Sequence, residues 1–262
     1  MQSISAANGR FVWFELMTTD LPAAIEFYRK VVGWETEDFQ MGGDAPPYTM
    51  WKVPGGASVG GVFPLPEQAK QMGAPPYWLG NLCVESVDDA VAKVTKLGGQ
   101  VHQPAFDVPT VGRIAIVADP TGATFALFQP AGEAPGHSGM PVPGEISWSE
   151  LMTTDPEAAW SFYEGLVGWK KTDSMEMGPE HGTYQMFGRA EGGMFGGMMR
   201  SPAQMPVSAW AFYLYVAALD AAIATAEANG GKLVSGPHPI PGGDRVATLI
   251  DPQGAYFALH GK

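Results

Sequence analysis

The order of apolar and polar positions predicts a strand followed by a helix at the start of the chain. Residues 11–19 (FVWFELMTT) form an apolar run rich in strand-forming residues, and Asp20 follows it as a candidate helix N-cap. The stretch 21–32 suits a helix that ends at Gly33 in the C′ position. Short apolar runs near 35–39, 48–53 and 57–63 predict three further strands. The first quarter is therefore expected to form a βαβββ module.

The second quarter has the same pattern. Residues 78–85 suit a strand, and Val87, Val91 and Val94 have helical spacing before Gly98, which is expected to end the helix. Further strands are expected near 100–103, 113–117 and 123–129. The first half of the chain thus predicts two βαβββ modules in series.

The second half of the chain repeats the first. The string WFELMTTD at 13–20 recurs as WSELMTTD at 148–155. Later motifs recur with nearly the same displacement, among them Phe-Tyr at 27 and 162, Gly-Gly at 60 and 196, and Asp-Pro at 119 and 251. The chain is a tandem duplication, and the predicted fold class is α+β with four βαβββ modules.

The boundary between the copies is expected in a Pro- and Gly-rich segment. We predict a first domain at 1–130, a linker at 131–143 and a second domain at 144–262.

Side chains alternate along the first strand of each copy. Val12 and Phe14 share one face, and Trp13 and Glu15 share the other. If the helix covers the Phe14 face, the Trp13 face points away from the helix, toward the space that the curved sheet encloses. Trp148 and Glu150 occupy the same places in the second copy.

Composition and charge narrow the classes of function. The chain has 262 residues, of which 45% are hydrophobic, so a folded core is expected. A net charge of −12 argues against nucleic acid as a partner. Cys83 is the single cysteine and can form no internal disulfide. The start lacks the pattern of a secretory leader, and no apolar run is long enough to cross a membrane. We therefore expect a cytoplasmic protein with no membrane partner. We also expect it to be a monomer or a homodimer.

The repeated motifs resemble a known superfamily. The stretch Asp20–Tyr28 (DLPAAIEFY), the following Gly33-Trp34 and the Asp-Pro-x-Gly-Ala-x-Phe-Ala-Leu motifs at 119 and 251 are similar to the vicinal oxygen chelate superfamily. That superfamily includes glyoxalase I, bleomycin-resistance proteins and extradiol dioxygenases. The chain looks most like its two-domain, glyoxalase-like bacterial members typified by a mycobacterial antigen. The resemblance covers nearly the whole chain, and it is more specific for the fold than for the function.

The resemblance implies that each pair of modules closes around a groove, where family members hold a divalent metal through His, Gln or Glu. The ligand positions that the resemblance implies fall on residues that cannot bind a metal, namely Trp13, Leu82, Ala126, Trp148, Leu214 and Ala258. We therefore expect no metal and no cofactor. A slip of two residues would bring Glu15, Glu150 and His260 into those positions, and Zn, Fe, Mn or Ni is then the alternative.

Glu15 and Glu150 are candidate catalytic groups because a carboxylate in an apolar strand needs a partner, a raised pKa or water. Each could be a general base or a polar anchor for a ligand. The alternative is a structural carboxylate that pairs with a nearby threonine or with Arg113 and its counterpart Arg245.

His260 lies near the end of the last strand, where alternation is expected to turn it toward the same groove as Glu150. The two side chains could act together in proton transfer. The alternative is an ordinary histidine near the C-terminus, a part of the chain that often frays.

Aromatic side chains are predicted to line the grooves. Apolar walls with a few polar groups are typical of small-molecule pockets, although they are also typical of cores. The candidate ligand-binding residues are Trp13, Tyr48, Trp51, Trp78, Trp148 and Trp210.

Two hypotheses for function remain open. The first is a metal-free, glyoxalase-like protein that binds a small aromatic or apolar metabolite between tryptophan-lined walls. The second is an enzyme, a lyase, isomerase or dioxygenase, that uses Glu150 and His260, and also Glu15, as acid–base groups or as unconventional metal ligands. The missing metal ligands favour the binding protein, and the paired carboxylates keep the enzyme as the alternative.

Overall fold

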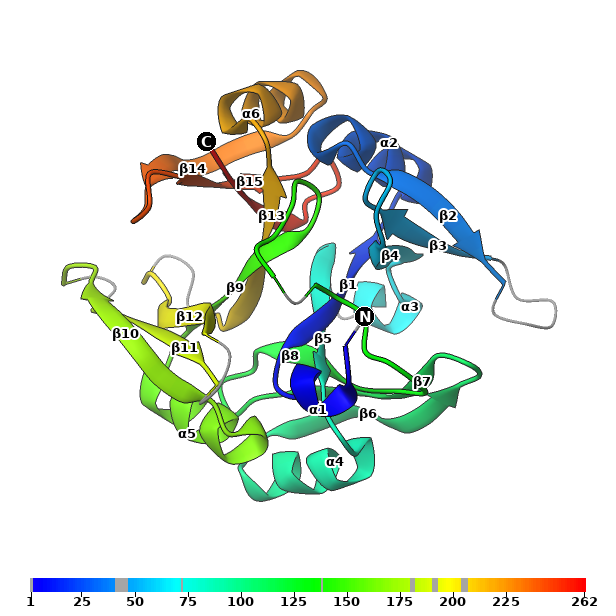
Figure 1. Ribbon diagram of the computed structural model, residues 1–262, viewed down its shortest axis with the longest axis vertical. Coiled ribbons are helices and arrows are strands. Elements are labelled where there is room, and N and C mark those ends of the chain that lie inside the picture. Colours follow the sequence, from blue (N-terminus) through cyan, green and yellow to red (C-terminus); the bar gives the residue numbers. More distant parts are fainter. Residues whose placement is uncertain are drawn as a thin grey trace. The chain divides into compact units, whose positions relative to one another are not determined.

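The computed structural model describes residues 2–40, 47–71, 73–137, 139–179, 182–189, 193–203 and 207–262, and Figure 1 shows the arrangement of its elements. The first half of the chain contains α1 (Ile4–Ala7), β1 (Phe11–Thr18), α2 (Leu21–Val32), β2 (Glu35–Phe39), β3 (Tyr48–Lys52), β4 (Ser58–Pro64), α3 (Glu67–Gln71), β5 (Tyr77–Cys83), α4 (Val87–Lys96), β6 (Gln100–Val108), β7 (Gly112–Ala118) and β8 (Thr124–Pro130). The second half contains β9 (Ile146–Thr153), α5 (Pro156–Val167), β10 (Lys170–Glu176), β11 (Thr183–Gly188), β12 (Met194–Arg200), β13 (Ala209–Val216), α6 (Leu219–Ala228), β14 (Lys232–Pro239), β15 (Arg245–Ile250) and β16 (Tyr256–Gly261).

The strands form two eight-stranded sheets, one from each half of the chain. The strand order is β2-β3-β4-β1-β5-β8-β7-β6 in the first sheet and β10-β11-β12-β9-β13-β16-β15-β14 in the second. In the first sheet β1 runs parallel to β4, and in the second sheet β9 runs parallel to β12. The pairs β2 with β3 and β10 with β11 are antiparallel. The predicted α+β class is confirmed. The predicted limits of the two domains at 130 and 144 stay a prediction.

The capping residues inferred from the sequence begin and end the helices. The Asp20 carboxylate accepts the backbone N–H of Ala23 at the start of α2, and Gly33 ends the helix with a φ of 84°. Asp155 and Gly168 do the same for α5, with a φ of 73° at Gly168. A residue with a Cβ rarely adopts this left-handed conformation, so the two glycines fix where each helix stops.

The chain divides into two compact units, and each unit draws on both halves of the sequence. The first comprises Met1–Val12, Gly80–Pro135 and Trp148–Ala211, and the second comprises Trp13–Leu79, Gly136–Ser147 and Phe212–Lys262. In the first unit α4 packs on α5, and in the second α2 packs on α6, as the ribbon shows (Figure 1).

Aromatic side chains fill the core of each unit. In the second unit Tyr28 of α2 is fully buried among Trp34, Trp51, Trp78 and Phe257. In the first unit Tyr163 of α5 has the corresponding place, among Phe125, Phe162, Trp169 and Trp210. The repeated Phe-Tyr and Gly-Trp motifs of the sequence therefore serve the cores.

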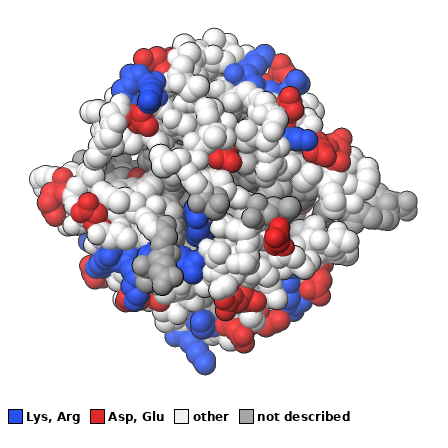
Figure 2. Space-filling model, in the orientation of Figure 1, with Lys and Arg blue, Asp and Glu red and all other residues white. Residues whose placement is uncertain are grey.

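The charged side chains are spread over the visible surface. On the face shown in Figure 2, Lys and Arg occur in small groups, most of them beside Asp or Glu. None of the described helices has the length and the apolar character needed to cross a membrane.

Candidate functional site

A hydrogen-bonded chain of three side chains joins β1 to β3. The indole N–H of Trp13 donates to the Tyr48 hydroxyl at 2.9 Å, and that hydroxyl donates to Glu15 Oε1 at 3.2 Å. Trp13 and Glu15 are two residues apart on β1, so alternation places them on one face of the strand. Tyr48 is buried, whereas Trp13 and Glu15 are partly exposed. The tyrosine thus fixes the position of a carboxylate that solvent still reaches.

The hydrogen bonds that join Trp13, Tyr48 and Glu15 depend on Gly61, which lies between strands β3 and β1. Strand β4 lies between β3 and β1, and Gly61 of β4 is in register with both Met50 and Glu15. Neighbouring strands are about 4.8 Å apart, so the Tyr48 side chain must cross β4 to reach β1. A Cβ at Gly61 would overlap the Tyr48 ring and hydroxyl. The second glycine of the pair at 60 and 61 therefore makes room for the tyrosine.

The second copy repeats this arrangement. The indole N–H of Trp148 donates to the Tyr184 hydroxyl at 2.7 Å, and Tyr184 is hydrogen-bonded to Glu150. Gly197 is in register with Glu150, and a Cβ there would overlap Tyr184. Glu150 is more buried than Glu15, with 8% of its surface exposed. Both copies thus hold a glutamate in the same way, one in each compact unit.

Burial keeps both tyrosines protonated. It raises the pKa of Tyr48 well above its usual value, and the negative charge of Glu15 raises it further. Burial and Glu150 have the same effect on the pKa of Tyr184. A tyrosine that stays protonated remains a hydrogen-bond donor to the carboxylate. The arrangement can therefore present a fixed glutamate to a hydroxyl or amino group of a bound molecule, or accept a proton from it.

The aromatic residues predicted to bind a ligand fall into two groups. Trp13, Tyr48 and Trp148 belong to the hydrogen-bonded chains, and Phe63 stacks on Tyr48 with ring centroids 4.5 Å apart. Trp51, Trp78 and Trp210 are buried against the helix tyrosines Tyr28 or Tyr163. The second group packs in the cores, and its part in ligand binding stays a prediction.

The core tryptophans have their own hydrogen-bonded chains. Trp78 donates its indole N–H to the Tyr28 hydroxyl at 3.2 Å, and Tyr28 donates to Asp251 Oδ2 at 3.0 Å. In the other unit, Trp210 donates to Tyr163 at 3.1 Å and Tyr163 donates to Asp119 at 3.1 Å. Each of these aspartates opens an Asp-Pro motif in the half of the sequence that does not supply the tyrosine.

His260 has polar neighbours within the second unit. Its Nδ1 lies 2.8 Å from Ser147 Oγ, and its Nε2 lies 3.2 Å from Asp244 Oδ2. The second contact is an ion-pair distance without the alignment of a hydrogen bond. Burial lowers the pKa of His260, and the Asp244 charge opposes that shift. Glu150 lies in the other unit, so its predicted pairing with His260 stays a prediction.

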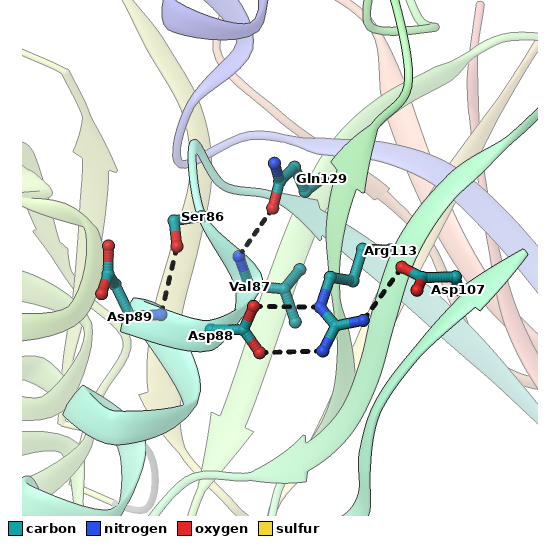
Figure 3. A network of polar contacts seen from close by, with 7 residues as sticks. All are labelled: Ser86, Val87, Asp88, Asp89, Asp107, Arg113 and Gln129. Atoms are coloured by element: carbon teal, nitrogen blue, oxygen red, sulfur yellow. Dashed lines mark hydrogen bonds and ion pairs between the residues drawn. The ribbon is translucent and has the colours of Figure 1, made fainter.

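The arginines considered as partners for the glutamates are paired elsewhere. Figure 3 shows Arg113 of β7 with two hydrogen bonds to Asp88 of α4, both of 3.0 Å, and one of 2.9 Å to Asp107 of β6. Arg245 makes the corresponding two bonds to Asp220, at 2.9 Å each. The partners found for the glutamates are tyrosines instead.

The described donor groups do not fit a divalent metal. Within the part of the chain that the structure describes, no three His, Cys, Asp or Glu side chains gather where one ion could bind them. The two glutamates are held by tyrosines, and His260 faces Ser147 and Asp244. A protein site for zinc or iron normally has at least three such donors. The metal ligands that the resemblance implies are not found among the described residues.

A shallow hollow of about 220 Å³ lies elsewhere, on the surface of the second unit. It contains none of the predicted site residues, and it is lined by Ala23, Glu26, Phe27, Lys30, Asn229, Pro252 and Gln253.

Several residues of the site were not predicted from the sequence. Tyr184 and the glycines at 61 and 197 were not among the candidate site residues. The signal was present, because the tyrosine and the glycine pair keep the same spacing in both copies. The partners of His260, by contrast, carry no sequence signal.

Comparison with known proteins places these features in a family. A profile of the Glyoxalase/Bleomycin resistance protein/Dioxygenase superfamily matches residues 10–127 and 145–259. The match covers both copies of the duplication, and it confirms the resemblance inferred from the repeated motifs.

Similar sequences span almost the whole chain. The protein CFP32 of Mycobacterium tuberculosis, provisionally named a glyoxylase, is 38% identical over 247 residues, which are 94% of this chain and 92% of that protein. The anthracycline biosynthesis protein DnrV of Streptomyces peucetius is 30% identical over 271 residues, which are 97% of this chain and 93% of that protein.

Solved structures share the fold at low identity. The Mn(II)-bound glyoxalase from Novosphingobium aromaticivorans has a TM-score of 0.62 and 17% identity, covering 97% of this chain and 82% of that one. Homoprotocatechuate 2,3-dioxygenase from Arthrobacter globiformis has a TM-score of 0.65 and 15% identity, covering 98% and 80%. At such identities the likeness supports the fold alone.

Proposed function

Because the chain belongs to the Glyoxalase/Bleomycin resistance protein/Dioxygenase superfamily, we propose that it binds a small aromatic molecule through the tyrosine-held glutamates of its two copies. The observation that carries this proposal is the chain from Trp13 through Tyr48 to Glu15, repeated as Trp148, Tyr184 and Glu150. A carboxylate at the same place in both copies, partly exposed in Glu15 and buried in Glu150, and each time fixed by a tyrosine, suits a ligand anchor.

The chemistry of the site suggests the kind of ligand. A carboxylate accepts hydrogen bonds, so the matching group on the ligand is a hydroxyl or an amine. The partly exposed rings of Trp13, which donates to Tyr48, and of Phe63, which stacks on Tyr48, offer apolar surface near it, which favours a flat aromatic body. The name of DnrV, an anthracycline biosynthesis protein, supports an aromatic ring system with hydroxyl groups as the ligand class.

The proposed role needs no metal. The anchor consists of side chains that the sequence itself supplies, and the described residues contain no set of three metal-binding donors. We propose a metal-free binding protein for this reason.

Titration with a polyhydroxylated anthracycline, followed by quenching of tryptophan fluorescence, tests the proposal. We expect saturable quenching in the wild-type protein and at least tenfold weaker binding in the double variant Glu15→Gln/Glu150→Gln, because each substitution removes a charged acceptor. Glu35→Gln is the matched control, because Glu35 is an exposed strand residue, and we expect it to bind as the wild type does. Equal affinity in the double variant and in this control would contradict the proposal.

An enzyme is the second candidate. The burial of Glu150 and its place in a fold shared with glyoxalases and dioxygenases favour a carboxylate that removes a proton from a bound substrate. Elemental analysis of the purified protein tests the metal-free role. A stoichiometric content of Zn, Fe, Mn or Ni would overturn the metal-free role and favour the enzyme, with Glu15, Glu150 and His260 as the first ligands to replace.

A further inference from the structure

The two copies differ at one set of equivalent positions. In the first unit these positions form a closed apolar cluster of Ala7, Val12, Cys83, Phe128 and Ala134, all buried, with Ile4, Val111 and Ile114 packed against it. Burial raises the pKa of the Cys83 thiol to about 12, so it stays protonated and unreactive. In the first copy this place is part of the core.

In the second copy three positions of this cluster, and the neighbouring position of Gly112, carry polar side chains. Alignment of the two copies on their repeated motifs pairs Val12 with Ser147, Cys83 with Tyr215, Gly112 with Asp244 and Phe128 with His260. A single polar replacement in a core leaves a buried group without a partner, which is destabilising. Here the polar side chains contact one another, so the changes act as a set.

The three side chains form a row. Ser147 Oγ lies 2.8 Å from His260 Nδ1, and on the other side of the ring His260 Nε2 lies 3.2 Å from Asp244 Oδ2. The ring of Tyr215 lies beside the imidazole, with centroids 5.0 Å apart. The Ser147 hydroxyl donates a hydrogen bond of 3.2 Å to the carbonyl oxygen of Tyr213, so it must rotate toward His260 Nδ1 before that nitrogen can take its proton. A serine, a histidine and an aspartate in this order are the components of a nucleophile, its base and the group that orients the base.

The charge of Asp244 favours one tautomer of the imidazole. A carboxylate beside Nε2 favours the form with its proton on Nε2, and this form leaves the Nδ1 lone pair directed at Ser147. Burial holds the pKa of His260 below its ordinary value, so the ring is neutral near pH 7 and can accept a proton. Asp244, from the turn before β15, is the charged group found to act on this ring.

The row is partly exposed to solvent, whereas the apolar cluster of the first copy is buried. The exposed fractions of the His260 and Asp244 side chains are 18% and 23%, and Ser147 is also partly exposed. In the first unit α1 covers the apolar cluster, and Ala7 of that helix is fully buried. The residue equivalent to Ala7 is Val142, which is 51% exposed and belongs to no helix. The segment around Ala7 therefore covers the apolar cluster in the first copy, whereas the equivalent segment around Val142 leaves the row of Ser147, His260 and Asp244 accessible.

We propose that Ser147, His260 and Asp244 form a reactive serine site that accepts an acyl group from a small ester. The Ser147 oxygen attacks the ester carbonyl carbon while its proton passes to His260 Nδ1. The bond to the alcohol then breaks, and the leaving oxygen takes the proton from His260. Water, deprotonated by the same nitrogen, releases the acid and restores the serine. This activity is independent of the aromatic-binding role, because it uses none of the tyrosine-held glutamates.

A fluorophosphonate probe tests the site directly. Such a probe forms a bond between the serine oxygen and phosphorus, and fluoride leaves, so that the mass of the labelled peptide identifies the residue. We expect labelling at Ser147 in the wild-type protein and hydrolysis of p-nitrophenyl acetate above the buffer rate. Absence of label at Ser147 in the folded wild-type protein would overturn the proposal without any variant.

Variants that restore residues of the first copy provide the comparison. Ser147→Val and His260→Phe introduce side chains that the equivalent place already accommodates, so we expect both to fold, as thermal unfolding will verify. Each should reduce ester hydrolysis at least tenfold, whereas Ser161→Ala, at an exposed serine of α5, should leave it unchanged. Unchanged hydrolysis in folded His260→Phe would contradict the role of the base. Binding of the aromatic probe should persist in Ser147→Val, so failure of one proposal is distinguishable from failure of the other.

Asp244 acts as a positioning residue, and its charge shifts the pKa of His260 in a defined direction. The Asp244 charge favours protonated His260, so Asp244→Asn should lower the pKa of the histidine. We expect the acidic limb of the pH–rate profile to move to lower pH while the maximal rate falls. If the acidic limb of the Asp244→Asn pH–rate profile stayed at the wild-type pH, the proposed contact between Asp244 and His260 would be ruled out.

Discussion

Tyr28 and Tyr48 lie in the same compact unit and make similar hydrogen-bonded chains in different surroundings. Each accepts an indole N–H and donates to a carboxylate. Tyr28 is fully buried, and the other oxygen of its partner Asp251 accepts three backbone N–H groups in the turn at 253–255. Tyr48 donates instead to Glu15, a strand residue that solvent reaches.

The difference separates a structural chain from one available to a ligand. Asp251 fixes a turn and holds a tyrosine from the other half of the sequence, so it helps to join the duplicated halves within the unit. Glu15 belongs to no turn, and its partner Tyr48 contacts the partly exposed rings of Trp13 and Phe63. Similar chemistry therefore serves packing in one place, and in the other it suits the proposed binding.

Removal of the buried carboxylate should have the largest effect. Asp251→Ala leaves three backbone N–H groups and the Tyr28 hydroxyl without their acceptor, so we expect a loss of about 3–5 kcal/mol in the free energy of unfolding. Urea unfolding measures it, with Asp119→Ala as the equivalent variant in the other unit. Asp38→Ala, at an exposed strand residue, should cost far less. A loss below about 1 kcal/mol at Asp251 would mean that the chain is not structural.

The glycine beneath Tyr48 should be the next most sensitive position. Gly61→Ala introduces a Cβ that overlaps the tyrosine, and we expect a loss of about 1–3 kcal/mol together with displacement of Tyr48 from Glu15. Binding of the aromatic probe should weaken in that copy. Gly132→Ala is the control, because an added Cβ there meets no neighbouring atom. Similar behaviour of the two variants would contradict the inferred crossing of Tyr48 over β4.

Deletion of each tyrosine hydroxyl compares the two chains directly. Tyr28→Phe deprives a buried aspartate and a buried indole of one partner, so we expect a loss of about 2 kcal/mol. In Tyr48→Phe water can replace the lost partner in part, and we expect about 1 kcal/mol. Thermal and urea unfolding give the stabilities, and the binding titration should show the opposite order, with Tyr48→Phe the weaker binder. Equal losses of stability would remove the distinction between the chains.

The smallest expected effect is a pH dependence from Asp251. Burial raises the pKa of this carboxyl in the folded protein, so as pH rises above about 3.9 the unfolded chain loses its proton first. The contribution of Asp251 to stability is therefore full below the unfolded pKa and is lost as pH rises through the folded pKa. Unfolding measured between pH 4 and pH 7 should show this decline in the wild type and less of it in Asp251→Asn. A wild-type curve parallel to that of the variant would contradict the raised pKa.

Much of the local structure could be predicted from the residues. The strand at 35–39 was predicted with the bounds that β2 has, and the caps Asp20 and Gly33 begin and end α2 as expected. These features depend on neighbours within a few positions, which a sequence displays directly. The short helices α1 and α3 were not predicted, because they are too short to show a periodic pattern.

The candidate site was only partly predictable. Glu15 and Glu150 stood out as carboxylates in apolar strands, and the duplication gave each a counterpart. Their tyrosine partners lie far from them along the chain, so only the pairing of β3 and β11 into the sheets brings them close. Trp51 and Trp78 could not be assigned to a pocket or a core from composition, because apolar rings are typical of both.

The sequence by itself determined the duplication, the order of strands and helices, the helix ends and the superfamily. Each follows from short-range pattern or from direct comparison of one segment with another. Only the tertiary structure decided which side chains meet. Tyr28 binds an aspartate 223 residues away, and Ser147 meets a histidine 113 residues away. Such contacts depend on how sheets and helices pack in three dimensions, and no local pattern of residues encodes a distance across the chain.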